Sequence, residues 1–288
     1  KLTMGLIEHK LKEAGLLKKT KRKIVKQGST VNLGEIRVEF IKTNHSIAGA
    51  SSLAIYTPAG IVFHTGDFKV DYTPLFGDSI DLQRMAILGK KGVLAVLSDS
   101  TNALRPGFTP SETKVAKTFD TLFAEHTKSR IIVATFASNV DRVQQIINTA
   151  QKYGRKVIVQ GRSMVNIIDI ATKIGCMKIP DGTLINVDEM KRYPDEQLVF
   201  ITTGSQGEAM AALSRMADST HKKVIIKPGD AIILSSTPIP GNEKLVGRII
   251  SGLAKMDVLV INDSSVEGLG SGHACQGELM LMQGLVHP

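Results

Sequence analysis

RIIVATF (residues 130–136) and KVIVQG (156–161) are two apolar runs, and the segment SNVDRVQQIINTAQKY (138–153) lies between them. The apolar runs predict buried strands, and the intervening segment predicts a helix that stops at Gly154. A strand, a helix and a strand in this order are typical of a parallel βαβ unit.

The same alternation extends on both sides of this unit. Upstream, Thr109 through Glu112 combine a capping residue, a proline at the first helical position and a glutamate three residues after the cap, and predict a helix to about His126. Downstream, the pattern predicts helices over 163–174, 208–218 and 243–256, and strands over 197–202, 231–235 and 258–261. Regular alternation of this kind favours a mostly parallel sheet with helices on both faces.

The first hundred residues have a different pattern. An amphipathic surface helix is predicted over 3–16, where apolar residues recur near helical spacing. Four short alternating or apolar runs follow, at 36–40, 53–56, 61–63 and 93–97, and turn residues separate them. These runs predict consecutive strands of one layer, so the whole chain is expected to be an α/β protein.

Composition and length set further bounds. The 288 residues are 42% hydrophobic, enough for a sizeable core in one large or two modest domains. Cys176 and Cys275 match no Cys-x-x-Cys spacing, and no leader peptide is recognisable, which favours a reducing cytoplasm. No apolar run has the ~18 residues of a membrane helix, so no membrane contact is expected. The chain begins with Lys1 rather than methionine, which indicates a boundary other than a natural start.

Positive charge is concentrated near the beginning of the chain. Residues 1–28 hold nine lysines and arginines against Glu8 and Glu13, whereas the net charge of the whole chain is +9. A basic stretch of this density suits a polyanion. The alternative is a solvated helix face and loop.

Small polar loops follow the predicted strands of the second half, at 136–139, 160–164, 203–208 and 235–238. In open α/β sheets, ligands bind at the carboxyl ends of strands, and helix N-termini there attract phosphate. Four such loops, with Arg162 in one of them, indicate a phosphate-rich ligand.

His45 and Asp67 are the first candidates for chemistry. His45 follows the strand at 36–40, and Asp67 follows the apolar strand at 61–63. A carboxylate just past a buried strand is costly unless it is hydrogen-bonded, paired or bound to metal. Imidazole and carboxylate are expected ligands of Zn²⁺ or Mn²⁺, and a carboxylate can bridge two ions. The alternatives are a structural histidine and a cap or turn aspartate.

Asp99 and His273 are the next candidates. Asp99 closes the apolar run at 93–97, and His273 lies in Ser-Gly-His after the last predicted strand. Both suit residues that support a metal site, or a general acid and phosphate contact. The alternatives are an Asx turn for Asp99 and a loop histidine for His273.

Seven motifs follow one another along the chain: NHS (44–46), TGDFK (65–69), SDSTN (98–102), PGFTPSE (106–112), TGSQGE (203–208), STPIPGNE (236–243) and SGHA (271–274). In this order they give the chain a resemblance to bacterial ribonuclease J, a member of the β-CASP group of the metallo-β-lactamase superfamily. The resemblance covers almost the whole chain. It implies a partial metallo-β-lactamase αββα domain over 1–105, an inserted β-CASP domain over 106–255 and a return to the first domain over 256–288.

The resemblance also implies roles for single residues. His45 would be a metal ligand, Asp67 the ligand that bridges two metal ions, and Asp99 and His273 the residues around the scissile phosphate. Further substrate contacts would come from Ser271, Gly272, Ser138, Asn139, Arg162, Ser163, Ser205 and Gln206.

The chain also departs from the family pattern. The family's His-x-His-x-Asp-His motif would lie upstream of Lys1, so the metal site is expected to be incomplete. His287 falls where the family usually has a lysine, and the family's last β-CASP histidine would follow Pro288. Leu269 replaces a common histidine, and Gly277 stands where an acidic residue or glutamine is usual.

The implied function is hydrolysis of RNA phosphodiester bonds in RNA maturation and decay, as a 5′-3′ exonuclease, an endonuclease or both. The resemblance implies two divalent metal ions. Zn²⁺ is the first choice, and Mn²⁺ and Mg²⁺ are the alternatives. The implied partners are single-stranded RNA with a 5′-monophosphate and, in the full-length protein, further copies of itself in a dimer or tetramer. Two alternatives stay open: an inactive RNA-binding or assembly subunit of a nuclease complex, and a small-molecule metallo-hydrolase on the same fold.

Overall fold

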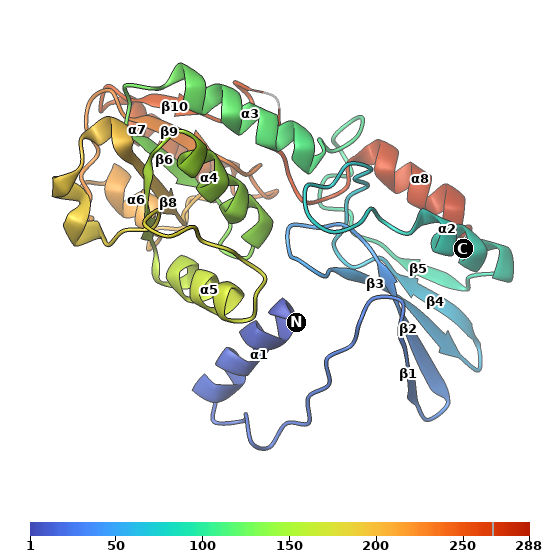
Figure 1. Ribbon diagram of the computed structural model, residues 1–288. Helices are drawn as coiled ribbons and strands as arrows, with labels where there is room; N and C mark the ends of the chain where they lie inside the picture. Colours follow the sequence, from blue (N-terminus) through green and yellow to red (C-terminus); the bar gives the residue numbers. More distant parts are fainter. Residues whose placement is uncertain (267) are drawn as a thin grey trace. The chain divides into compact units, whose positions relative to one another are not determined.

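Two five-stranded sheets organise the chain (Figure 1). The computed structural model describes residues 1–266 and 268–288. Residues 1–112 and 271–288 form unit 1, which holds the first sheet, and residues 113–270 form unit 2, which holds the second.

The sheet of unit 1 is mixed. Its strands, in spatial order, are β1 (Thr30–Leu33), β2 (Ile36–Lys42), β3 (Ser51–Thr57), β4 (Gly60–His64) and β5 (Ala95–Leu97). The first four pair antiparallel, and β5 runs parallel to β4. The four strands expected from the sequence are confirmed, and β1 was not anticipated.

Unit 1 also holds three helices: α1 (Leu2–Glu13), α2 (Leu82–Lys91) and α8 (Gln276–Val286). Met85 of α2 and Met282 of α8 pack with Phe63 of β4 in one apolar core. Helices α2 and α8 approach closely at Gly89, where an added Cβ would lie 2.1 Å from the Leu285 carbonyl oxygen. Only glycine allows this contact, which fixes α8 and therefore the segment that precedes it.

The sheet of unit 2 is fully parallel. Its spatial order is β10 (Leu259–Ile261), β9 (Ala231–Leu234), β6 (Ile131–Ala134), β8 (Leu198–Thr202) and β7 (Lys156–Gln160). The order reverses around β6, so the loops after β6, β8 and β9 gather at one edge of the sheet. The expected mostly parallel α/β sheet is confirmed.

Helices alternate with these strands: α3 (Glu112–Glu125), α4 (Val140–Lys152), α5 (Arg162–Lys173), α6 (Ala212–Ala217) and α7 (Glu243–Ala254), with two 3₁₀ turns at Val187–Arg192 and Asp195–Gln197. Leu213 of α6 and Val246 of α7 pack with Phe200 of β8 in the core. Helices α4 and α5 end just before Gly154 and Gly175, where the sequence predicts that they stop, and both glycines adopt positive φ.

Two local expectations differ from the structure. Helix α6 begins at Ala212 rather than at 208, because Gly204 and Gly207 take positive φ and hold a turn ahead of it. Thr109 does not cap α3, since its hydroxyl lies 2.7 Å from the His273 carbonyl oxygen and from a Glu278 carboxylate oxygen instead. Helix α1 forms as expected, but its only buried residue is Leu2.

The boundaries of the two units also differ from the expected 106–255 and 256–288. Strand β10 pairs in parallel with β9, so residues 256–270 stay with the second sheet. Residues 106–112 stay with unit 1, because Thr109 and Glu112 bond to that unit. Among the described residues, no helix is both long and apolar enough to cross a membrane.

Candidate metal and phosphate site

Loops of unit 1 bring together three side chains of the types that can bind a metal ion. His45 follows β2, Asp67 follows β4, and His273 precedes α8. One ligand atom from each of the three lies within 4.8 Å of the others. The two residues that the sequence predicts as metal ligands therefore meet, and His273 joins them from more than two hundred residues away.

The His45 ring is held in one tautomer by the backbone. Its Nδ1 lies 2.9 Å from the Gly272 carbonyl oxygen, which can only accept, so Nδ1 carries the proton. The lone pair is left on Nε2, which lies 3.7 Å from an Asp67 carboxylate oxygen. A histidine oriented by a carbonyl in this way is typical of metal ligands.

Gly272 is needed for this arrangement. A Cβ at this position would lie 1.9 Å from the Ser46 hydroxyl and 3.0 Å from His45 Nδ1. Any side chain would push the 271–273 loop away from His45. The contact that Gly272 makes in the structure is thus with His45 itself, and its predicted contact with substrate stays a prediction.

Asp67 presents its carboxylate outward. Gly66, with φ of 62°, turns the chain just after β4, and the Asp67 side chain is 63% exposed. This exposure matters because an accessible carboxylate beside the Nε2 of His45 is available to an ion.

Asp99 supports His273 rather than facing an ion. One carboxylate oxygen lies 2.9 Å from His273 Nδ1, and the other accepts hydrogen bonds from the Thr101 amide and hydroxyl. The Asp99 side chain is 2% exposed. Burial acts to raise its pKa, but the hydrogen bonds from His273 and Thr101 outweigh burial and lower the pKa to about 2. Asp99 therefore makes the Asx turn and also pairs with His273.

The two histidines carry opposite pKa shifts although their ring centroids lie 4.9 Å apart. Burial lowers the pKa of His45 and favours its neutral form. Burial also acts to lower the pKa of His273, but the hydrogen bond and negative charge of Asp99 outweigh it and raise that pKa. A neutral ring suits an ion, and a cationic ring beside it suits a phosphate.

Histidine titration followed by NMR in the metal-free protein tests this pair. His273 is expected to titrate above the ordinary value of 6.5, and His45 below it. Asp99→Asn should lower the pKa of His273, since it removes the negative charge and the ionic hydrogen bond, and should move His45 much less. A His273 pKa unchanged in Asp99→Asn would contradict the pairing.

The other predicted substrate residues fall into two groups. Arg162 and Ser163 are exposed at the start of α5, whose N-cap Gly161 gives no side-chain cap, and Ser138 is partly exposed. Asn139 instead caps α4 through the Arg142 amide, and buried Gln206 bonds to Ser236, Thr237 and Ile239. Ser205 is also buried. Their roles toward RNA stay predictions.

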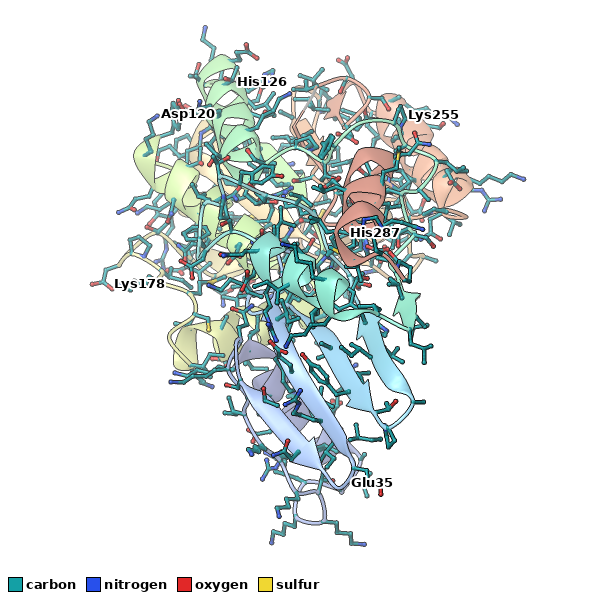
Figure 2. The ribbon with its side chains drawn as sticks, turned by 90° about the vertical axis from the view of Figure 1, so that its right-hand side faces the viewer. Glu35, Asp120, His126, Lys178, Lys255 and His287 are labelled. Carbon is teal, nitrogen blue, oxygen red and sulfur yellow. The ribbon has the colours of Figure 1, made fainter. Side chains whose placement is uncertain are left out.

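Ser271 is also partly engaged within unit 1. Its hydroxyl oxygen accepts hydrogen bonds from Asn102 Nδ2 at 3.0 Å and from the His273 amide at 3.1 Å. Because the oxygen already accepts two hydrogen bonds, the Ser271 hydroxyl can contact a ligand only by donating its proton. His287, by contrast, is exposed after the end of α8 (Figure 2) and is not a member of the three-residue group.

Two features of the site were missed from the sequence. Asn102 holds the 271–273 loop through its side-chain amide, and Glu278 is a fully buried carboxylate beneath it. The spacing of Cys275 and Glu278 is that of a capping box, and the structure forms that box at the start of α8. The spacing of these two residues was the sequence signal that could have identified Glu278.

Gly277 has no room for a side chain, since a Cβ there would lie 2.6 Å from the Phe108 ring.

The donors present fit a divalent ion in part. Catalytic zinc sites take three protein ligands from histidine and carboxylate side chains, and His45 and Asp67 supply both kinds. A cationic His273 would not bind an ion, so two ions would need donors besides these three.

The comparison with protein families agrees with this fold. Residues 128–253 match the family model described as "Ribonuclease J, beta-CASP domain". The chain is thus an α/β protein with a β-CASP domain, which is consistent with the metallo-β-lactamase superfamily.

Within that class, the similarity is to ribonuclease J. The chain is 45% identical over its whole length to "Ribonuclease J" of Helicobacter pylori (strain 26695) and covers 42% of that protein. It is 42% identical to "Ribonuclease J" of Thermus thermophilus and 40% identical to "Ribonuclease J2" of Bacillus subtilis, again over its whole length, and covers 50% and 52% of them. Residues 128–253 thus match the β-CASP domain model of ribonuclease J, and the chain spans about half the length of these relatives.

A solved structure shares the fold. The crystal structure of a protein of unknown function from Enterococcus faecalis V583 aligns with all of this chain and 67% of its own, with a TM-score of 0.66 and 17% identity.

Proposed function

We propose that this chain is part of a metal-dependent ribonuclease that hydrolyses RNA phosphodiester bonds, as a 5′-3′ exonuclease, an endonuclease or both. The observation that carries the proposal is the meeting of His45, Asp67 and the Asp99–His273 pair in a chain similar throughout to proteins named ribonuclease J. Zn²⁺, or else Mn²⁺ or Mg²⁺, is the proposed ion.

His45 and Asp67 would hold the ion. His45 offers Nε2 because Gly272 fixes the proton on Nδ1, and Asp67 offers an exposed carboxylate. When bound, such an ion supplies Lewis acidity and lowers the pKa of water. The ring of His45 would stay oriented throughout, since its hydrogen bond goes to backbone.

His273 and Ser271 would act on the phosphate. Asp99 orients the His273 ring through Nδ1 and favours its cationic form, so Nε2–H can donate to an oxygen on which negative charge develops. The Ser271 hydroxyl keeps its proton for a second such hydrogen bond.

Single-stranded RNA is the proposed substrate, and the basic segment 18–26 supports this choice. It has little regular structure, and its lysines are exposed. Arg22 pairs with Glu8 at 2.6 Å, but within residues 1–266 and 268–288 no ion pair engages Lys18, Lys19, Lys21, Lys23 or Lys26. Unpaired surface cations contact a nucleic acid backbone without sequence preference.

Replacing these five lysines by glutamine should weaken RNA binding by the intact protein and flatten its salt dependence. The slope of log affinity against log salt should lose about 0.7 for each phosphate contact removed. Fluorescence anisotropy at several salt concentrations measures both effects. The matched control replaces five exposed lysines elsewhere: Lys90, Lys128, Lys191, Lys222 and Lys255. Equal losses of RNA affinity in both variants would show that RNA binding depends on the total charge of the protein and not on segment 18–26.

Cleavage of a 5′-monophosphorylated RNA by the intact protein tests the proposed function. Cutting with added Zn²⁺ or Mn²⁺ that stops with a chelator supports it, and a 5′-triphosphorylated RNA reports whether the 5′ end matters. RNA binding without cleavage under every metal condition would overturn it in favour of an inactive RNA-binding or assembly subunit.

A further inference from the structure

Glu278 is a fully buried carboxylate in the first turn of α8. One of its oxygens accepts a hydrogen bond from the Val70 amide at 2.6 Å. The other accepts from the amides of Thr109 at 2.8 Å and Cys275 at 2.7 Å, and lies 2.7 Å from the Thr109 hydroxyl. A buried carboxylate is costly unless it is hydrogen-bonded, and these donors offset that cost.

The bonds of Glu278 reach both segments that carry the site. Val70 lies three residues after Asp67, and Cys275 lies two residues after His273. The buried side chain of Glu278 thus holds the backbone that follows Asp67 and the backbone that follows His273.

Thr109 adds a second link to the histidine. Its hydroxyl oxygen lies 2.7 Å from the His273 carbonyl oxygen as well as from Glu278. A hydroxyl has one proton, so it donates to one of these acceptors at a time. When it donates to His273, Thr109 links the 271–275 loop to Glu278, because the Thr109 amide also donates to that carboxylate. When it donates to Glu278, the loop is held to the carboxylate through the Cys275 amide.

The loop that carries Asp67 also forms hydrogen bonds to residues 110–112. Lys69 donates from Nζ to Glu112 at 2.8 Å and to the Pro110 carbonyl oxygen at 3.1 Å, and Asp71 accepts from the Glu112 amide at 2.8 Å. Lys69 and Asp71 are both buried. The loop is therefore fixed on both sides of Val70, so a change at Glu278 should shift it without releasing it.

We propose that Glu278 is a positioning residue that sets the distance between Asp67 and His273. This inference rests on the proposed function, because it takes those two side chains as the ones that meet the ion and the phosphate. Glu278 touches neither, and acts through the amides of Val70 and Cys275.

Glu278→Gln in the intact protein tests the inference. The amide keeps the shape but replaces one acceptor oxygen by a donor that faces other donors. Zn²⁺ affinity, measured by competition with a chromophoric chelator, is expected to fall by roughly 10–100-fold, as for other residues that orient ligands. Metal-dependent kcat should fall with it, and RNA affinity without metal should stay unchanged. Glu243→Gln, an exposed glutamate in the first turn of α7, is the control.

A second pair of variants keeps the test decisive if Glu278→Gln does not fold. Thr109→Val removes the hydroxyl alone and should weaken Zn²⁺ binding less, and Thr109→Ser should restore it. Zn²⁺ affinity and kcat unchanged in folded Glu278→Gln, or in Thr109→Val, would overturn the inference alone. An unsubstituted protein that neither binds Zn²⁺ nor cuts RNA would overturn the proposed function as well.

Discussion

Asp67→Ala is expected to lower the kcat/KM of metal-dependent RNA cleavage by more than about 100-fold, the upper range for residues that merely orient a metal ligand. The physical reason is the position of the carboxylate, 3.7 Å from His45 Nε2 and open to solvent. Because the Asp67 side chain is 63% exposed, its loss removes the proposed metal ligand and little packing. The melting temperature of the metal-free protein should therefore stay unchanged.

The matched control is Asp78→Ala. Asp78 is also an exposed aspartate of unit 1, with a side chain 77% exposed and paired with Lys42, and it lies outside the three-residue group. Its substitution should leave kcat/KM unchanged. If Asp67→Ala cuts RNA as fast as Asp78→Ala does, Asp67 has no part in the reaction and the metal assignment is wrong.

Local pattern was enough to predict the first half of the site. His45, Asp67 and Asp99 each follow a strand that the sequence marks clearly, and polar residues at strand ends meet at one edge of a sheet. The register of β4 with β5 places His64 beside Leu97, which sets the segments of Asp67 and Asp99 side by side.

The partner of Asp99 could be predicted only from the family resemblance. His273 lies 174 residues further along the chain, and no local period reports a contact of that separation. The same holds for Glu278, whose bonds to Val70 and Thr109 span 208 and 169 residues.

Long-range contacts also explain the local errors. The residues from Thr109 to Glu112 have the spacing of a capping box, but Glu278 and His273 compete for the Thr109 hydroxyl and Asp71 takes the Glu112 amide. Tertiary hydrogen bonds to buried groups outweigh a surface cap worth about 1 kcal/mol. The capping box at Cys275 and Glu278 does form, because its glutamate serves the local and the distant partners at once.

Asp230→Asn is expected to destabilise the β-CASP domain by about 3–5 kcal/mol, the usual cost of breaking a buried ion pair from one side. Arg130 and Asp230 precede the neighbouring parallel strands β6 and β9 and are both buried. They form two hydrogen bonds, of 2.9 and 2.5 Å, and the arginine also donates to the Ile225 carbonyl oxygen. Asparagine keeps the shape but leaves the guanidinium charge unpaired, so Tm should fall by roughly 10 °C.

The control is Asp169→Asn, which breaks the exposed pair of Asp169 with Lys173 on α5 and should change stability by less than about 0.5 kcal/mol. A double variant, Arg130→Met with Asp230→Leu, separates two explanations. If the loss in Asp230→Asn comes from an unpaired buried charge, the apolar pair should recover most of the stability, since well-packed apolar replacements of buried ion pairs are often neutral. If it comes from the lost tether between the starts of β6 and β9, the double variant should melt as low as Asp230→Asn. The first result is expected, because the backbone pairing of β6 with β9 begins at the next residue of each strand and holds the register by itself.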